Sequence, residues 1–254
     1  MNLVSIIIPC YNHAAFLEQT VLSVISSDYP SLEIIIVDDG SNDDSVKVGQ
    51  RLSEKYQIVK AIQQINQGPA AARNNGIKMA SGNFILPLDA DDLIATHYIS
   101  RAMLEFKDEK VSLVYCNAEF FGEKTGEWKL KTFSLRSLAQ DNMIFCSAIY
   151  RKKDWESAGG YDERMTWGWE DWEFWISLLK NEGKVVKLPF TGFYYRVRKN
   201  SRRKSTDKGA KLKTIQLINS KHQDFLYKYL KGPLHYQRSW SKRINIVKQL
   251  FGLK

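Results

Sequence analysis

The chain has 254 residues, of which 44% are apolar, and this is enough for one sizeable α/β domain with or without an appendage. No apolar run reaches the ~18 residues of a membrane-spanning helix, so no membrane span is expected. The start, MNLVSIIIPC, has no basic segment ahead of its apolar run, so no secretory signal is expected. The three cysteines, Cys10, Cys116 and Cys146, are scattered, which favours reduced thiols in a cytoplasmic protein over a disulfide or a zinc site.

The net charge of +9 is unevenly distributed along the chain. From Arg196 to the end there are 17 Lys and Arg against 2 Asp and Glu, which gives +15. The first 195 residues hold 20 basic and 26 acidic residues, which gives −6. A mildly acidic body with a strongly basic tail predicts an anionic surface as a partner of the tail.

The first 115 residues alternate between strand and helix patterns. This alternation is typical of right-handed βαβ units, so we predict an α/β fold with a mostly parallel sheet flanked by helices. Buried strands are expected at 3–9, 32–39, 58–64, 83–89 and 111–116, and helices at 14–27, 43–56 and 68–81.

The pattern is less regular after residue 116. We expect a β excursion around a glycine-containing turn at 117–134, a helix at 167–183, and two more strands at 184–189 and 191–197. From about residue 200 the pattern is helical and basic, with a break between two tail helices at Gly232–Pro233. We therefore predict a main domain over 1–200 and a basic helical C-terminal extension over 201–254.

Polar and acidic side chains follow three of the predicted strands. The first strand ends in PCYN (9–12), the second in VDDGS (37–41) and the fourth in LDADD (88–92). In open parallel sheets, ligands bind beyond the carboxyl ends of the strands, which meet at one edge. The three strand ends therefore predict one binding site.

The stretch FILPLDADDLI (84–94) places three aspartates within four positions, and such a cluster needs a positive charge nearby. Asp89 and Asp91 point the same way in an extended segment, so one can bind Mg²⁺ or Mn²⁺ and the other a sugar hydroxyl. For Asp92, a capping role at the next turn is equally supported. A phosphatase-type Asp-x-Asp site fits poorly because Leu93 stands where that family has Thr or Val, and no Gly-x-Gly-x-x-Gly follows the first strand.

A second constellation is TWGWEDWEFW (166–175). Trp169, Trp172, Ile176 and Leu179 recur at helical spacing and predict a core-facing stripe. Glu170 and Asp171 fall in the first turn, where the helix dipole is expected to keep Asp171 ionised at neutral pH and able to act as a base. For Trp167 and Trp169, a sugar-stacking wall and core packing remain open alternatives.

Four blocks of the sequence, in order, resemble the family 2 glycosyltransferases: SIIIPCYN, EIIIVDDGSNDDS, NQGPAAARNNGIKMASGNFILPLDADD and GWEDWEFWISLL. The resemblance covers residues 3 to 200. It implies a GT-A fold and an inverting enzyme that uses nucleotide-diphosphate sugars and a divalent metal, Mn²⁺ or Mg²⁺.

The resemblance also implies site residues. Asp171 would be the catalytic base and Glu170 would orient the acceptor or the helix, while Asp91 would be the metal ligand. The donor would be bound by Pro9, Tyr11, Asn12, Asp39, Arg73, Asn74, Asp89 and Arg198, with Asp39 on the pyrimidine edge. Many relatives carry a metal-binding His near the position of Arg198, and here the closest one along the chain to that position is His222, in the tail.

The sequence thus predicts a cytoplasmic, metal-dependent, inverting glycosyltransferase with a UDP-sugar or another nucleotide sugar as donor and a glycan or lipid-linked glycan as acceptor. The alternative is a non-catalytic nucleotide-sugar-binding scaffold. No nucleic-acid partner is expected. Residues 236–254 resemble an interfacial amphipathic helix that would attach the protein peripherally to the anionic inner face of a membrane, although packing on the body or against a second copy in a homo-oligomer is an open alternative.

Overall fold

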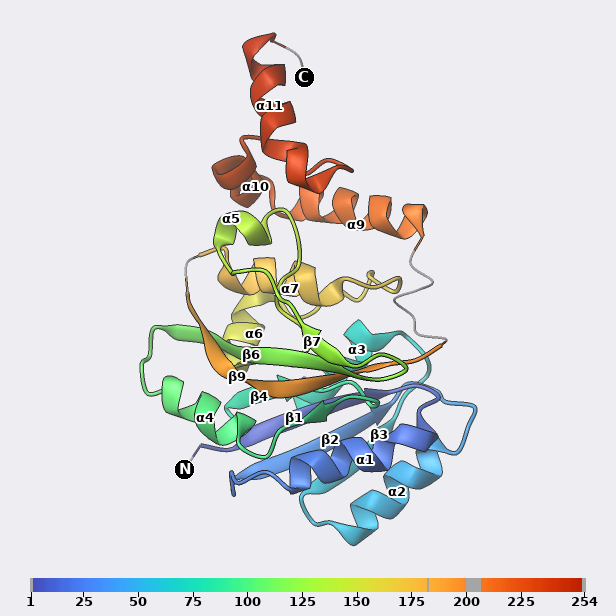
Figure 1. The fold of residues 1–254 in the computed structure, drawn as a ribbon. Coiled ribbons are helices and arrows are strands. Elements are labelled where there is room, and N and C mark those ends of the chain that lie inside the picture. Colours follow the sequence, from blue (N-terminus) through green and yellow to red (C-terminus); the bar gives the residue numbers. More distant parts are fainter. Residues whose placement is uncertain (1, 182, 200–206, 253–254) are drawn as a thin grey trace.

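The computed structural model describes residues 2–181, 183–199 and 207–252. It contains one mixed sheet with helices on both faces and a helical C-terminal part above it (Figure 1). The strands are β1 (Val4–Cys10), β2 (Leu32–Asp38), β3 (Val59–Gln63), β4 (Phe84–Pro87), β5 (Leu93–Ile94), β6 (Val111–Gly122), β7 (Gly126–Trp128), β8 (Ile149–Arg151) and β9 (Lys184–Val197). The helices are α1 (Ala14–Ile25), α2 (Ser45–Lys55), α3 (Pro69–Met79), α4 (Tyr98–Glu105), α5 (Leu135–Leu138), α6 (Lys152–Ala158), α7 (Glu170–Leu179), α9 (Lys208–Lys221), α10 (Gln223–Leu230), the 3₁₀ turn η1 (Arg238–Trp240) and α11 (Ser241–Leu250).

The N-terminal half is a parallel sheet in the order β3-β2-β1-β4, as predicted. Ile6 pairs with Ile34 on one side and Leu86 on the other, so the β-branched runs lie side by side in the core. Helices α1 and α2 pack together on one face of this sheet, and α3 lies on the other (Figure 1). The carboxyl ends of β1, β2 and β4 therefore meet at the same edge.

The second half of the sheet differs from the expectation in β5, β6, β8 and β9. Antiparallel β8 joins β4 to β6, and β6 continues past residue 116 to Gly122, where β7 forms the expected excursion. The two strands predicted at 184–189 and 191–197 are one strand, β9, parallel to β6. The sheet register shifts between Leu188 and Thr191, so a bulge accommodates Pro189 without ending the strand.

Helix α7 is shorter than predicted because the backbone before it turns sharply. Gly168 and Trp169 both have positive φ, of 113° and 61°, so the helix begins at Glu170 rather than at residue 167, and it ends at Leu179. The predicted apolar stripe is confirmed as core, since Trp172, Ile176 and Leu179 are fully buried, whereas Trp169 is half-buried.

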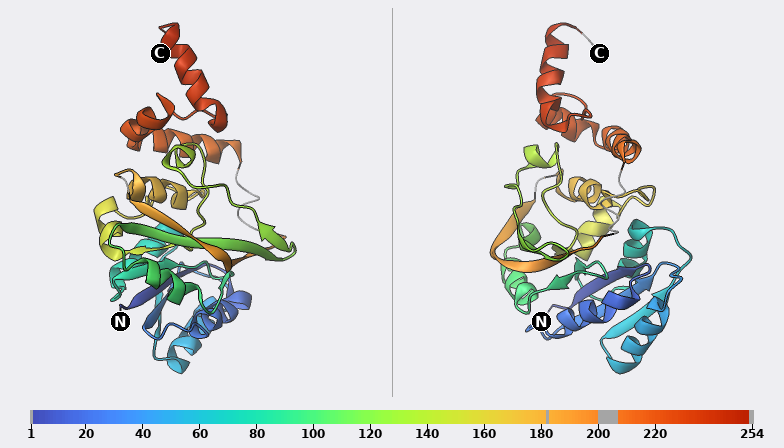
Figure 2. Two further views of the ribbon diagram at one scale, coloured as in Figure 1. Left: turned by 60° about the vertical axis from the view of Figure 1, so that its left-hand side comes forward. Right: turned by 45° about the vertical axis from the view of Figure 1, so that its right-hand side comes forward.

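The C-terminal helices share the core of the sheet domain. Ile215, Ile218, Phe225 and Leu226 belong to the same continuous group of buried apolar residues as β1. The boundary predicted between residues 200 and 201 lies outside the described residues, and the break expected at Gly232–Pro233 separates α10 from η1 and α11. Helix α11 projects from the rest of the molecule (Figure 2). Within the described ranges, no helix is both long enough and apolar enough to cross a bilayer.

Candidate active site

A cavity of about 1210 Å³ opens at the carboxyl ends of β1, β2 and β4, between them and the start of α7. Every predicted site residue except Asn74 lines it. The residues that the structure brings together are Pro9, Tyr11, Asn12, Asp39, Arg73, Asp89, Asp91, Glu170, Asp171 and Arg198.

The part of the cavity nearest β1 and β2 combines an exposed aromatic side chain with a buried acid. Tyr11 is 43% exposed, so a face of its ring is available to a base. Asn12 has a positive φ of 57°, and its side-chain oxygen accepts a hydrogen bond from the backbone N–H of Asn42, which fixes the loop after β1 against the loop after β2. Asp39 accepts two hydrogen bonds at Oδ1 and one at Oδ2, from residues 64–68. One acceptor position therefore remains on Oδ2.

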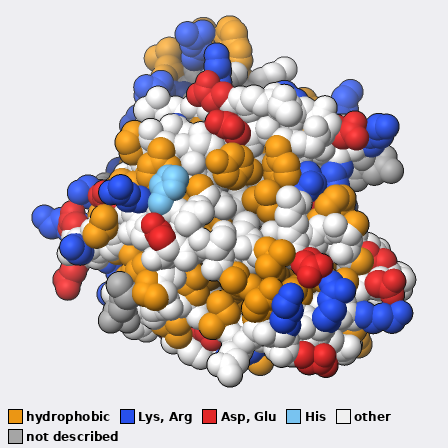
Figure 3. Space-filling view, turned by 60° about the horizontal axis from the view of Figure 1, so that its bottom comes forward, with side chains coloured by type: hydrophobic (Ala, Val, Ile, Leu, Met, Phe, Trp, Pro, Cys, Tyr) orange, Lys and Arg blue, Asp and Glu red, His pale blue; other side chains and the backbone are white. Residues whose placement is uncertain are grey.

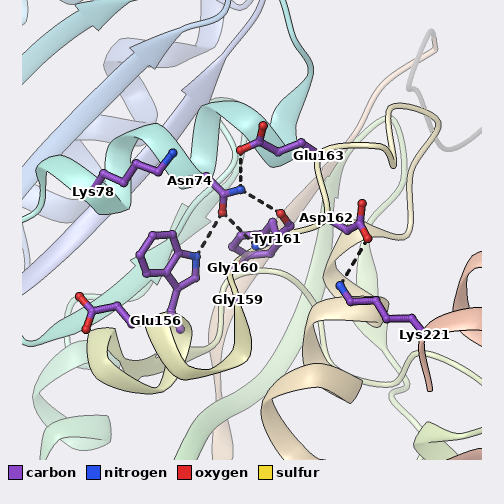
Figure 4. Close-up of a pocket in the computed structure, with 10 residues that line it drawn as sticks. Asn74, Lys78, Glu156, Gly159, Gly160, Tyr161, Asp162, Glu163 and Lys221 are labelled. Atoms are coloured by element: carbon purple, nitrogen blue, oxygen red, sulfur yellow. Dashed lines mark hydrogen bonds and ion pairs between the residues drawn. The ribbon is translucent and has the colours of Figure 1, made fainter. Parts of the chain in front are cut away.

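Asn74 lies outside this cavity, contrary to the expected place beside the nucleotide. Its amide donates to the backbone oxygen of Tyr161 and to Glu163, and its oxygen accepts from Trp155 and from the backbone N–H of Tyr161 (Figure 4). These contacts use its full hydrogen-bonding capacity and line a separate, smaller cavity of about 580 Å³. In this structure Asn74 fastens the 155–163 segment to α3.

Arg73 connects the two acidic sides of the cavity. Its guanidinium donates to Asp89 Oδ1 and to Glu170 Oε1, both at 2.7 Å, and the side chain is 3% exposed. Burial is the largest influence on the pKa of Asp89 and raises it, but the charge and the hydrogen bond of Arg73, together with the Cys146 hydrogen bond, lower that pKa overall. Arg73 thus keeps Asp89 ionised and holds the start of α7 beside the end of β4.

Each of the three clustered aspartates has its own partner within the chain. Asp89 pairs with Arg73, and Asp91 Oδ2 lies 2.8 Å from Arg198 Nε. Asp92 accepts a hydrogen bond from the backbone N–H of Arg196 at 2.8 Å. Asp92 is 1% exposed, and burial, followed by the charges of Asp91 and Asp89, raises its pKa well above the ordinary value. Asp92 therefore joins β9 to the β4 loop, and Asp89 and Asp91 are the two members of the aspartate cluster that face the cavity.

His13 is a cavity residue that the sequence interpretation missed. It precedes α1, and its Nε2 lies 2.7 Å from Arg198 Nη2 and 3.7 Å from Asp91 Oδ2. Burial lowers the pKa of His13 in spite of the nearby Asp91. Position 13 directly follows the PCYN motif, and this adjacency is the only sequence signal that points to it.

Asp171 lies in the first turn of α7, as predicted, but its ionisation differs from the prediction. Asp171 Oδ2 accepts a hydrogen bond from the Asn142 amide at 2.8 Å, and Asp171 Oδ1 accepts one from the backbone N–H of Trp172 at 2.8 Å. Burial and the neighbouring Glu170 raise the pKa of Asp171 to about 7, so the helix dipole does not keep it fully ionised at neutral pH. A base of this pKa is well matched to proton transfer near pH 7.

The wall around Asp171 combines the predicted 166–175 constellation with segments that carried no recognised motif. Trp128 of β7, Asn142, Cys146 and the half-buried Trp169 line the cavity, and so does Arg238 from the C-terminal part. Arg238 Nη1 pairs with Asp141 Oδ1 at 2.8 Å. Trp167 also lines the cavity, and its indole N–H donates to Thr214 of α9. The C-terminal helices therefore take part in this side of the site.

The family model for glycosyl transferase family 2 matches residues 5–166, which is more than half of the chain. A second model, for the N-terminal domain of galactosyltransferase, matches residues 136–200. Among curated relatives, an Escherichia coli glycosyltransferase, YibD, is 36% identical over 65% of this chain and 46% of its own length. A Campylobacter jejuni GalNAc(5)-diNAcBac-PP-undecaprenol beta-1,3-glucosyltransferase is 34% identical over 57% of this chain and 46% of its own length. The chain spans about half the length of these relatives.

Two solved structures share the fold over nearly the whole chain. TarS of S. aureus in complex with UDP-GlcNAc aligns with a TM-score of 0.74 at 20% identity, over 97% of this chain and 75% of that one. The mannosyltransferase PcManGT of Pyrobaculum calidifontis, in complex with GDP-Man and Mn²⁺, aligns with a TM-score of 0.68 at 20% identity, over 99% and 75%. These likenesses confirm the GT-A-type fold expected from the sequence.

Proposed function

Because the chain belongs to glycosyl transferase family 2, we propose that it moves a sugar from a nucleotide-diphosphate donor to a hydroxyl of a glycan or lipid-linked glycan. The observation that carries the proposal is the cavity in which the strand-end residues of the donor side meet Asp171 of α7. Glycosyltransferases among its relatives and structural neighbours support the same class of activity.

The donor side of the cavity suits a UDP-sugar. The open face of Tyr11 would stack on the base, and the remaining acceptor position of Asp39 would take an imide N–H of a pyrimidine. Pro9 and Asn12 would complete the nucleoside pocket, and the ionised Asp89 would accept a hydrogen bond from a ribose or donor-sugar hydroxyl. Arg198 would neutralise part of the charge of the diphosphate.

Transfer would be a single displacement with inversion. The acceptor hydroxyl gives its proton to Asp171 while its oxygen forms a bond to the anomeric carbon. The bond from that carbon to the diphosphate oxygen breaks, and the nucleoside diphosphate leaves with the electron pair from the opposite face. Glu170 is held by Arg73, so it would position the start of α7 and hence Asp171.

A divalent cation, Mn²⁺ or Mg²⁺, fits the chemistry of this cavity with the donor present. Asp91 offers carboxylate oxygen, which both ions prefer, but the described residues contain no group of three His, Cys, Asp or Glu side chains that could hold a metal alone. We expect Asp91 to bind the ion together with diphosphate oxygens. The ion would supply charge neutralisation for the leaving group.

The projecting helix α11 would place the protein on an anionic membrane surface that carries a lipid-linked acceptor. Trp240, Val247, Leu250 and Phe251 are exposed, with Leu250 and Phe251 more than 70% accessible. Lys242 and Arg243 of the same helix supply positive charge, and basic and hydrophobic side chains stand together at the top of the molecule (Figure 3). Apolar side chains beside cations are the composition of an interfacial helix. An undecaprenol-linked acceptor in the name of the C. jejuni relative agrees with this placement.

The function can be tested with a panel of nucleotide sugars. Donors that bind the native chain should raise its melting temperature in the presence of Mn²⁺. With donor and a glycan acceptor, Asp171→Asn should lower transfer by about 10²- to 10⁴-fold, the usual contribution of a general base, and change donor affinity only a few-fold. Asp224→Asn, an exposed acid of α10, is the control and should leave both unchanged. Donor binding without hydrolysis or transfer by the wild-type chain would favour the scaffold alternative.

A further inference from the structure

The guanidinium of Arg198 connects two side chains that come from distant segments. Its Nε lies 2.8 Å from Asp91 Oδ2, in the loop after β4, and its Nη2 lies 2.7 Å from His13 Nε2, in the loop after β1. Asp91 Oδ2 and His13 Nε2 are themselves 3.7 Å apart. The guanidinium of Arg198 therefore lies between the carboxylate oxygen of Asp91 and the imidazole nitrogen of His13.

These two atoms form a donor pair suited to a divalent metal. A guanidinium only donates hydrogen bonds, so His13 Nε2 faces Arg198 with its lone pair, which is the form of imidazole that binds metals. Two bonds of about 2.1 Å to a shared ion can span up to about 4.2 Å, and the separation of 3.7 Å lies within that limit. Carboxylate with imidazole is a common ligand combination for first-row divalent ions.

Of the neighbouring Arg196 and Arg198, Arg198 is the one whose guanidinium contacts with the described residues a diphosphate could replace. The Arg196 guanidinium is held by the backbone oxygen of Asp91 and by Gln19, and its backbone N–H donates to Asp92. Among the described residues, the Arg198 side chain contacts His13, Asp91 and the face of Phe16. Arg198 lines the cavity and is partly exposed, so a diphosphate entering the cavity can compete for its guanidinium. A guanidinium binds phosphate oxygens in bidentate fashion.

We propose that His13 is the second protein ligand of the metal bound by Asp91, and that Arg198 keeps this site closed until the donor diphosphate draws the guanidinium away. The proposal rests on the function proposed above. It assigns the imidazole ligand to the loop after β1 rather than to the position of Arg198, where the family resemblance led us to expect a histidine. It also predicts that metal and donor strengthen each other's binding by the same factor, as linkage requires.

The test is calorimetric titration of Mn²⁺ into the purified chain, with and without UDP. Arg198→Gln should tighten Mn²⁺ binding without UDP by at least about 10-fold, because no side chain then closes the site. UDP should strengthen Mn²⁺ binding less in Arg198→Gln than in the wild type. Adding His13→Gln to Arg198→Gln should weaken Mn²⁺ binding by about 10-fold or more. The matched controls are Arg101→Gln and His97→Gln, two exposed residues of the α4 region outside the cavity.

Two outcomes would overturn the proposal. If His13→Gln leaves Mn²⁺ binding unchanged in the Arg198→Gln background, His13 is not a ligand. If Arg198→Gln does not tighten Mn²⁺ binding, Arg198 does not close the site. UDP binding and sugar transfer measured with a chelator present report on the proposed function separately, so either can persist when the metal assignment fails.

Discussion

Two carboxylates of the same cavity, Asp89 and Asp171, are held in opposite ways. Asp89 is paired at 2.7 Å with the buried guanidinium of Arg73, and its pKa is lowered. Asp171 receives hydrogen bonds from a neutral amide and a backbone N–H, lies next to Glu170, and has a pKa raised to about 7. Burial raises the pKa of both groups, so the difference comes from their partners.

The difference in pKa suits Asp89 and Asp171 to different roles. An acid that stays ionised can accept hydrogen bonds from a donor sugar throughout the reaction, whereas an acid with a pKa near 7 can take up a proton and release it again. Environments that push the pKa values of neighbouring acids apart are how one site obtains both behaviours. Arg73 creates the contrast because it pairs directly with Asp89 and Glu170, whereas none of the described residues forms an ion pair with Asp171.

Replacing Arg73 should have the largest effect. Arg73→Met leaves Asp89 and Glu170 without their shared cation, and removing one partner of a buried ion pair typically costs 3–5 kcal/mol. Because Asp89 is partly exposed, we expect about 3 kcal/mol in the free energy of unfolding, measured by urea denaturation at neutral pH.

The control is Arg51→Met, which breaks an exposed pair with Glu18 and should cost less than about 1 kcal/mol. Adding Glu170→Gln to Arg73→Met should recover part of the loss, because it removes one of the unpaired charges. Equal costs for the Arg73 and Arg51 variants would show that Arg73 does not support the donor-side acids.

The pH dependence of sugar transfer tests the Asp171 half of the comparison. Only ionised Asp171 can act as a base, so the rate should fall about 10-fold per pH unit below pH 7 and level off above it. Asn142→Ala removes a hydrogen bond that lowers the pKa of Asp171, and the midpoint should move up by about one unit. The control, Asn219→Ala, loses hydrogen bonds to Leu234 outside the cavity and should leave the midpoint in place.

Stability gives an independent measure of the same pKa. A raised pKa in the folded state means that stability is lost as pH rises from the unfolded value to the folded one. The melting temperature of Asp171→Asn relative to the wild type should therefore rise between about pH 4 and pH 7 and then stay constant. A constant difference over that range would contradict a raised pKa for Asp171.

The donor side could be predicted largely from the sequence because its signals are local. Parallel strands place their carboxyl ends at one edge, so the residues after β1, β2 and β4 had to meet. Asn74 is the exception on this side, because the sequence could not show that its amide is taken up by the 155–163 segment.

The electrostatics could not be predicted, because they depend on pairs far apart in the sequence. Arg73 and Glu170 are separated by 97 residues, and Arg198 and His13 by 185. The cavity wall formed by β7, the 141–146 segment and Arg238 could not be predicted for the same reason, because its parts are also far apart in the sequence. The dipole argument for Asp171 did not take account of burial and of Glu170, both of which raise the pKa of Asp171.

The smallest expected effect concerns the acceptor side, where η1 contributes Arg238 to the cavity and α11 extends away from it. If α11 lies in an anionic membrane surface, the chain should bind vesicles with phosphatidylserine more tightly than neutral ones, and salt should weaken that binding. Trp240→Ala and Phe251→Ala should each weaken it a few-fold, since each removes exposed apolar area. Lys242→Gln should weaken binding to anionic vesicles alone, by about 1 kcal/mol at most.

Ile65→Ala, an exposed apolar residue on the donor side, is the matched control and should have no effect. Equal binding to neutral and anionic vesicles, or a concentration-dependent dimer that Phe251→Ala dissolves, would instead assign this helix to a protein interface.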